Sequence, residues 1–166
     1  MGPDQSLYIV RKNPLAIVVS GLSSDAHTWN LVYIQLVLEE LGHRVTNLGD
    51  CVPDQDLVAH CRTAQPDLIV LSSVNGHGFQ DGMRVISALR EYPALIATPV
   101  VIGGKLDTVG GDPTMADQLL AAGFDAIFPE DGDGKDVMLS AFRSFVAFVA
   151  ESPAPAGASV TSPVGA

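Results

Sequence analysis

The chain has 166 residues, 47% of them hydrophobic, and a formal net charge of −10. This length predicts one domain that buries its own core, and no apolar run approaches the roughly 18 residues of a membrane span. The acidic charge excludes nucleic acid and anionic membrane surfaces as partners, because both require a basic footprint. Two cysteines, Cys51 and Cys61, match neither a disulfide framework nor a zinc motif. No basic segment followed by an apolar one opens the chain, so we expect a cytoplasmic protein without a secretory signal.

The first part of the chain alternates apolar runs with a helical pattern. Leu15–Ser20 is apolar and β-branched without alternation, as in a strand that is buried on both faces. Trp29–Leu41 carries apolar residues at helical spacing, and Gly42 is a suitable helix end. His43–Gly49 predicts a second, shorter strand, with His43 at the surface beside the helix end.

The same alternation continues to the end of the chain. A helix begins at Pro53 and ends before Pro66, and we expect its buried face to consist of Leu57, Val58, Cys61 and Ala64. The later strands are predicted at Leu68–Ser72, Pro99–Gly104 and Asp125–Phe128. The later helices are predicted at about Phe79–Glu91, Thr114–Ala122 and Gly134–Ala150. Residues 1–13 read as a loose arm, 14–150 as the domain, and 151–166 as a disordered tail rich in Pro, Ala, Gly and Ser.

Strands that alternate with helices predict an α/β protein: a doubly wound, five-stranded parallel sheet with helices on both faces. We expect the flavodoxin-like strand order 2-1-3-4-5. The loops after strands one, three, four and five then share one edge of the sheet, beside the point where the strand order reverses. Ligands of such sheets bind at this edge.

The loop after the first strand contains Asp25 and His27, among Ser, Thr and Asn residues. A carboxylate that holds one ring nitrogen of a histidine commonly presents the other nitrogen to a metal. The competing interpretation is that Asp25 or Asn30 caps the following helix and that His27 is an ordinary surface residue. Spacing alone leaves both interpretations open.

Other loops at this edge carry Ser72 and the pair Gly103-Gly104, which are suited to a close ligand but are equally ordinary at strand ends. A phosphorylated receiver domain requires an Asp at the end of strand three, where this chain has Ser72. A flavodoxin requires a Ser/Thr-rich phosphate loop before the first helix, where Trp29 would crowd a phosphate. The glycine fingerprint of dinucleotide binders and the P-loop are both absent.

Three motifs at the right strand ends resemble those of cobalamin-binding domains: Asp25-x-His27, Ser72-x-Val74 and Gly103-Gly104. The resemblance is closest to the small subunit of glutamate mutase (methylaspartate mutase) and covers roughly residues 14 to 148. The family has Gly where this chain has Asn30, a residue that tolerates left-handed backbone. The chain also differs from the small subunit at Asn75 and at Glu130-Asp131-Gly132.

The resemblance implies a Rossmann-like fold that binds adenosylcobalamin, with His27 as the lower ligand of cobalt and Asp25 holding its ring. The displaced nucleotide tail would lie between the sheet and the first helix. The implied cofactor-binding residues are Ser24, Asp25, Ala26, His27, Thr28, Ser72, Val74, Asn75, Gly76, Gly103, Gly104, Phe128 and Pro129. His27 is the single implied metal ligand, and no other catalytic residue is implied on this chain.

The family implies an isomerase subunit that is inactive alone. A barrel-type large subunit would hold the substrate, in a heterotetramer of two small and two large chains. Homolysis of the cobalt–carbon bond would then start a radical rearrangement of glutamate to 3-methylaspartate. Two alternatives stay open: a corrinoid shuttle for methyl transfer, which usually carries a helical bundle before this domain, and a cobalamin sensor or degenerate binding module without activity.

Overall fold

The structure is a computed structural model that describes residues 14–108, 112–130 and 134–153. Among these residues, the strands form one five-stranded parallel sheet in the order β2-β1-β3-β4-β5, which confirms the predicted fold. The strands are β1 (Ala16–Gly21), β2 (Arg44–Asn47), β3 (Leu68–Ser73), β4 (Val100–Gly104) and β5 (Ala126–Pro129). The helices are α1 (Trp29–Glu40), α2 (Asp54–Ala64), α3 (Gly78–Arg90), the 3₁₀ helix η2 (Pro93–Leu95), α4 (Met115–Ala122) and α5 (Lys135–Glu151).

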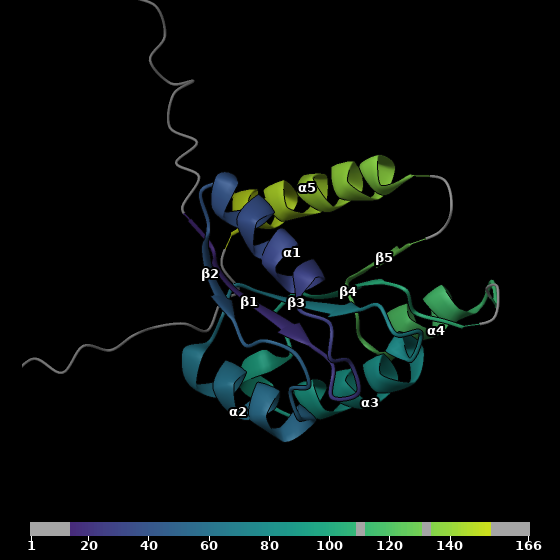
Figure 1. The fold of residues 1–166 in the computed structure, drawn as a ribbon. Coiled ribbons are helices and arrows are strands. Elements are labelled where there is room, and N and C mark those ends of the chain that lie inside the picture. The colour runs from purple at the N-terminus through teal and green to yellow at the C-terminus, as the bar shows by residue number, and fades with distance from the viewer. Residues whose placement is uncertain (1–13, 109–111, 131–133, 154–166) are drawn as a thin grey trace, which may run out of the picture.

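Helices cover both faces of the sheet. Helices α1 and α5 lie on one face, and α2, α3 and α4 lie on the other (Figure 1). Successive residues of a strand point to opposite faces, so Val18 packs toward α2 and α3 while Val19 packs toward α1 and α5. Since both faces are covered, the inner strands are apolar without alternation, as the sequence predicted.

The carboxyl ends of the strands meet at one edge of the sheet. Gly21 pairs with Ser72, Ser72 with Gly103, and Gly103 with Phe128, so these four residues form a continuous row across four strands. The loops that follow β1, β3, β4 and β5 therefore begin side by side. The tertiary structure brings the separate sequence motifs to this edge.

The prediction that His43 lies at the surface is wrong. Its side chain is 8% exposed, and its Nδ1 accepts a hydrogen bond of 3.1 Å from the backbone N–H of Leu15. The imidazole thus satisfies a backbone donor at the start of β1, which explains its burial. Ala64, predicted to be buried, is instead exposed, because α2 ends at this residue beyond the core.

The boundaries of the elements otherwise follow the sequence closely. Helix α5 continues to Glu151, which is the first residue of the expected tail. The arm 1–13 and the tail from residue 154 lie outside the described residues, as do Asp131 and Gly132. No helix in the described part of the chain combines the length and the apolar character needed to cross a membrane.

Candidate functional site

Asp25 is the buried anchor of the loop between β1 and α1. Its side chain is 1% exposed, and its Oδ2 accepts hydrogen bonds from the backbone N–H of Val74 at 2.6 Å and of Asn75 at 3.3 Å. Burial by itself raises the pKa of Asp25, but the hydrogen bonds from Val74 and His27 outweigh it and lower the pKa below its ordinary value. The carboxyl group is therefore an anion at neutral pH.

His27 is held by the other oxygen of this carboxylate. Asp25 Oδ1 lies 2.7 Å from His27 Nδ1 and also accepts the backbone N–H of His27 at 3.0 Å. An anionic acceptor favours the tautomer that carries its proton on Nδ1, which leaves the lone pair of the neutral ring on Nε2. The His27 side chain is 61% exposed, and no described residue hydrogen-bonds to its Nε2. The ring is thus oriented and its second nitrogen is available to a ligand.

The interpretation of Asp25 or Asn30 as a helix cap is wrong. Helix α1 begins after Thr28, and no side chain caps it. Asn30 lies inside the helix, and its Nδ2 donates a hydrogen bond of 2.7 Å to Ser72 Oγ at the end of β3. Ser72 Oγ accepts this bond, which leaves its own proton free to be donated elsewhere.

An apolar groove of about 560 Å³ lies between α1 and α5, above the carboxyl ends of β3 and β4. Trp29, Asn30 and Tyr33 line it from α1, while Leu139 and Phe142 line it from α5. Predicted site residues form its floor and walls, namely Ser72, Val74, Gly103, Gly104 and Phe128. The groove therefore starts two residues from His27 and runs between the sheet and the first helix.

The glycine pair at the end of β4 is required by the packing of the strands, independently of any ligand. A Cβ on Gly103 would lie 2.8 Å from the carbonyl oxygen of Phe128. Gly104 has a φ of +93°, and a Cβ there would overlap the carbonyl oxygen of Ser73. Close packing of neighbouring strands thus explains both glycines, and their lack of side chains also keeps the groove open.

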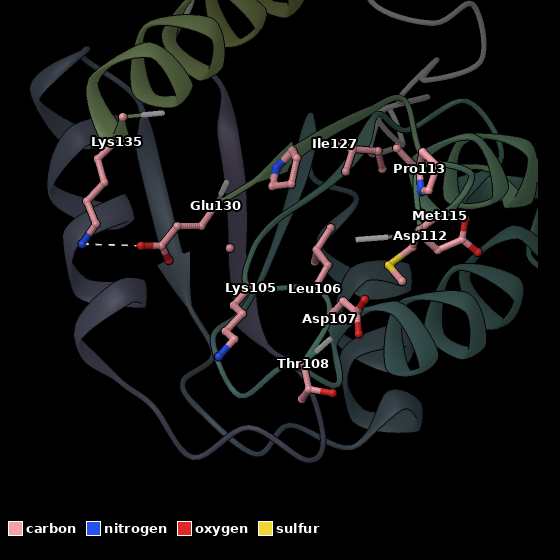
Figure 2. Close-up of a pocket in the computed structure, with 14 residues that line it drawn as sticks. Lys105, Leu106, Asp107, Thr108, Asp112, Pro113, Met115, Ile127, Glu130 and Lys135 are labelled. Carbon is pink, nitrogen blue, oxygen red and sulfur yellow. Dashed lines mark ion pairs between the residues drawn. The ribbon is translucent and has the colours of Figure 1, made fainter. Parts of the chain in front are cut away.

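A second, larger cavity of about 970 Å³ lies beside the groove, at the carboxyl ends of β4 and β5 (Figure 2). Lys105, Asp107 and Pro129 line it, and it shares Glu130 and Lys135 with the groove. Figure 2 shows Lys135 reaching toward Glu130, with 3.6 Å between Nζ and Oε1. No residue of the described loop that carries His27 lines this cavity, so it is separate from the oriented imidazole. Pro129, a predicted site residue, faces this cavity.

The other predicted site residues lie around the Asp25–His27 pair. Ser24, Ala26 and Thr28 are exposed in the same loop. Asn75 Nδ2 donates to the backbone oxygen of Ser24 at 2.8 Å, and Gly76 follows Asn75 in the loop after β3. The structure thus joins the first and third loops, whereas the glycine pair and Phe128 belong to the groove.

The described residues include no group of three or more His, Cys, Asp or Glu side chains that could hold a metal ion. The single oriented nitrogen, His27 Nε2, would fit a metal that is already held by a macrocycle and needs only one ligand from the protein. The groove beside that nitrogen fits an attached organic tail. Asn30 Oδ1 is a buried side-chain oxygen of the groove wall with no partner among the described residues, which leaves an acceptor unsatisfied there.

Sequence reasoning placed the tail between the sheet and the first helix but missed the contribution of α5 to the groove, and it missed the Asp81–Arg84 pair behind the loop. The three-residue spacing of Leu139 and Phe142 is typical of one helix face, but it does not indicate which element packs against that face. Asp81 and Arg84 are a visible pair three residues apart on a helix. Nothing local indicated that Asp81 is only 6% exposed.

The sequence of this chain matches one known family. The family model of the B12 binding domain matches residues 15–137. The chain belongs to this family.

Named relatives narrow the comparison. The chain is 32% identical over 90 residues to the glutamate mutase sigma subunit of Fusobacterium nucleatum, covering 54% of this chain and 65% of that subunit. It is 26% identical over 124 residues to glutamate mutase sigma subunit 2 of Haloarcula marismortui, covering 74% of this chain and 82% of that one. The match thus spans just under two thirds of the Fusobacterium subunit.

Solved structures share the fold. A cobalamin-binding protein from Desulfitobacterium hafniense superposes with a TM-score of 0.61 at 21% identity, over 79% of this chain and 59% of that chain. A chemotaxis response regulator from Vibrio cholerae superposes with a TM-score of 0.57 at 18% identity, over 78% of this chain and 98% of that chain. These likenesses establish the fold alone, because proteins with different functions share it.

Proposed function

We propose that this chain is the cobalamin-carrying small subunit of an adenosylcobalamin-dependent carbon-skeleton mutase of the glutamate mutase type. The observation that carries the proposal is the Asp25–His27 pair next to an apolar groove, in a chain of the B12-binding domain family. The names of the relatives support the reaction class. Both cysteines are free thiols, which suits the reducing cytoplasm where we place the protein.

The residues of this chain would bind and orient the cofactor. His27 would coordinate cobalt through Nε2, and Asp25 would keep its proton on Nδ1 and make the ring a better donor. The groove would take the nucleotide tail, with the Ser72 hydroxyl free to donate a hydrogen bond to it. When bound, adenosylcobalamin supplies a weak cobalt–carbon bond as the source of a radical.

We further propose a barrel-type large subunit as the partner, in a complex of two small and two large chains. Helix α1 exposes three large side chains, with Trp29 83% exposed, Leu36 59% and Tyr33 55%, and Trp29 and Tyr33 also line the groove. Such residues are usual where a second protein covers a helix. Their position directly after His27 supports a partner that encloses the cofactor.

Titration with adenosylcobalamin tests the binding proposal. We expect a base-off, histidine-ligated absorption spectrum and quenching of the fluorescence of Trp29, the single tryptophan of the chain. His27→Ala should abolish the histidine-ligated spectrum and weaken binding by at least about 10-fold. His77→Ala is the matched control, because this exposed histidine lies in the neighbouring loop and should leave the spectrum unchanged.

The reaction is tested with the large subunit of a relative's glutamate mutase. Rearrangement of glutamate should require both chains and the cofactor, and His27→Ala should reduce it. A free-corrinoid spectrum without Trp29 quenching contradicts cobalamin binding by this chain. Binding without any rearrangement contradicts the mutase assignment and favours a methyl-transfer carrier or a sensor.

A further inference from the structure

A charged cluster lies behind the loop that carries His27, on the opposite side from the groove. Arg84 of α3 donates through Nε to Asp54 Oδ2 at 2.5 Å and through Nη1 to Asp81 Oδ1 at 2.9 Å. Its Nη2 donates to Ser23 Oγ at 2.8 Å. One guanidinium group thus connects α2, α3 and the loop after β1.

Asp81 is the buried centre of this cluster, with 6% of its surface exposed. Its Oδ1 accepts from Arg84, and its Oδ2 accepts the hydroxyl proton of Ser24. Asn75 Nδ2 donates to the backbone oxygen of the same Ser24 at 2.8 Å. Ser24, the residue before Asp25, is therefore bound both to α3 and to the loop after β3.

We propose that Asp81 and Arg84 are positioning residues that act on His27 through Ser23 and Ser24, a role that rests on the proposed function. Polar contacts hold the loop on two sides: the Asp25 carboxylate accepts from the backbone of Val74, while on the α3 side Ser24 donates to Asp81 and Ser23 accepts from Arg84. An exposed loop has few apolar contacts to fix its path, so polar attachments on both sides of the turn decide where the imidazole points. Loss of one attachment lets the ring leave the Asp25 carboxylate.

The competing role is purely structural, since the Arg84–Asp54 contact also joins α3 to α2. Ser24→Ala separates the two roles. It removes the hydroxyl that connects the loop to Asp81 and leaves the contacts of Arg84 with both carboxylates in place. Ser24→Thr keeps a hydroxyl and is the conservative variant, and Ser87→Ala, an exposed serine of α3, is the control.

The first readout is the tautomer of His27 in the cofactor-free chain, from ¹⁵N chemical shifts of the ring at one neutral pH. The wild type should show the Nδ1–H form, Ser24→Ala a mixture of tautomers, and Ser24→Thr and Ser87→Ala the wild-type pattern. The second readout is adenosylcobalamin binding. Ser24→Ala should weaken the affinity by about 10-fold and lower the fraction of bound cofactor that shows the histidine-ligated spectrum.

A lower melting temperature in Ser24→Ala with an unchanged tautomer and an unchanged histidine-ligated fraction overturns the positioning role. If the wild type binds no cobalamin, the proposed function fails, and the tautomer comparison still decides whether the cluster orients the ring. Arg84→Met gives an independent check, because it should change the tautomer in the same direction as Ser24→Ala.

Discussion

The two carboxylate oxygens of Asp25 hold different parts of the chain. Oδ1 meets His27 and Oδ2 meets the backbone of Val74, so one side chain joins the loop after β1 to the loop after β3. A carboxyl group whose pKa is lower in the folded than in the unfolded chain stabilises the fold above its unfolded pKa. That contribution is lost as the pH falls through the folded pKa. For Asp25 this range starts near the ordinary value of 3.8 and extends below it.

Asp25→Asn should therefore lower the free energy of unfolding most at neutral pH. At about pH 7 we expect a loss of about 1–3 kcal/mol, because the amide offers N–H groups where the surrounding atoms are donors. At about pH 3 the difference should narrow, since Asp25 of the unfolded wild type is then largely protonated and the advantage of the folded carboxylate decreases. Urea unfolding at both pH values measures this, with the exposed Asp56→Asn as control. A difference that grows as the pH falls contradicts this role of Asp25.

Among the secondary-structure elements, β3 and β4 approach each other so closely at their carboxyl ends that position 104 has no room for a side chain. Ser73 pairs with Gly104 in the sheet, and Gly104 has a left-handed φ of +93° directly beside the Ser73 backbone. The loops that carry Val74 and Lys105 begin at this point. The geometry of this strand pair thus sets the floor of the groove.

Gly104→Ala should destabilise the chain more than a glycine-to-alanine replacement at a site where the positive φ is strained but the added methyl group meets no other atom. Gly42 is the matched control, because its φ is +90° and a Cβ there meets nothing within 4 Å. Gly42→Ala should cost about 1 kcal/mol, and Gly104→Ala about 3 kcal/mol or more, from strain plus overlap with β3. Urea unfolding compares the two variants, and equal losses would show that β3 yields to the added methyl group.

Across the whole molecule, the layers of helices exclude solvent from the centre of the fold. Cys61 of α2 is fully buried, and burial raises the pKa of its thiol to about 12. Cys51 is exposed in the loop before α2. Since the thiolate is the reactive species, we expect Cys51 to react in the native chain and Cys61 to react only when the chain unfolds.

A thiol reagent at neutral pH should modify one cysteine of the native chain quickly and the second only after unfolding. Cys51→Ser should remove the fast phase and leave the slow phase of Cys61. Adenosylcobalamin at about 100 times its dissociation constant should add about 2.7 kcal/mol of stability and slow the Cys61 phase accordingly. The time course of labelling measures both effects, and a rapidly labelled Cys61 in the native chain contradicts the tight packing of α2.

The amino-acid sequence by itself determined the order of elements, because unbroken apolar runs, helical spacing and glycine ends are local features. The strand order was predicted from the fold class, and the pairing of the strands confirms it. It also singled out Asp25 and His27, which are two residues apart; their role in cobalt binding stays a prediction. Only the tertiary structure decided that His43 is buried, that Asn30 meets Ser72 and that Ser24 meets Asp81. These last two pairs are 42 and 57 residues apart in the chain. Periodicity shows which side of an element is covered, but only the packing of elements against one another selects the side chains that meet there.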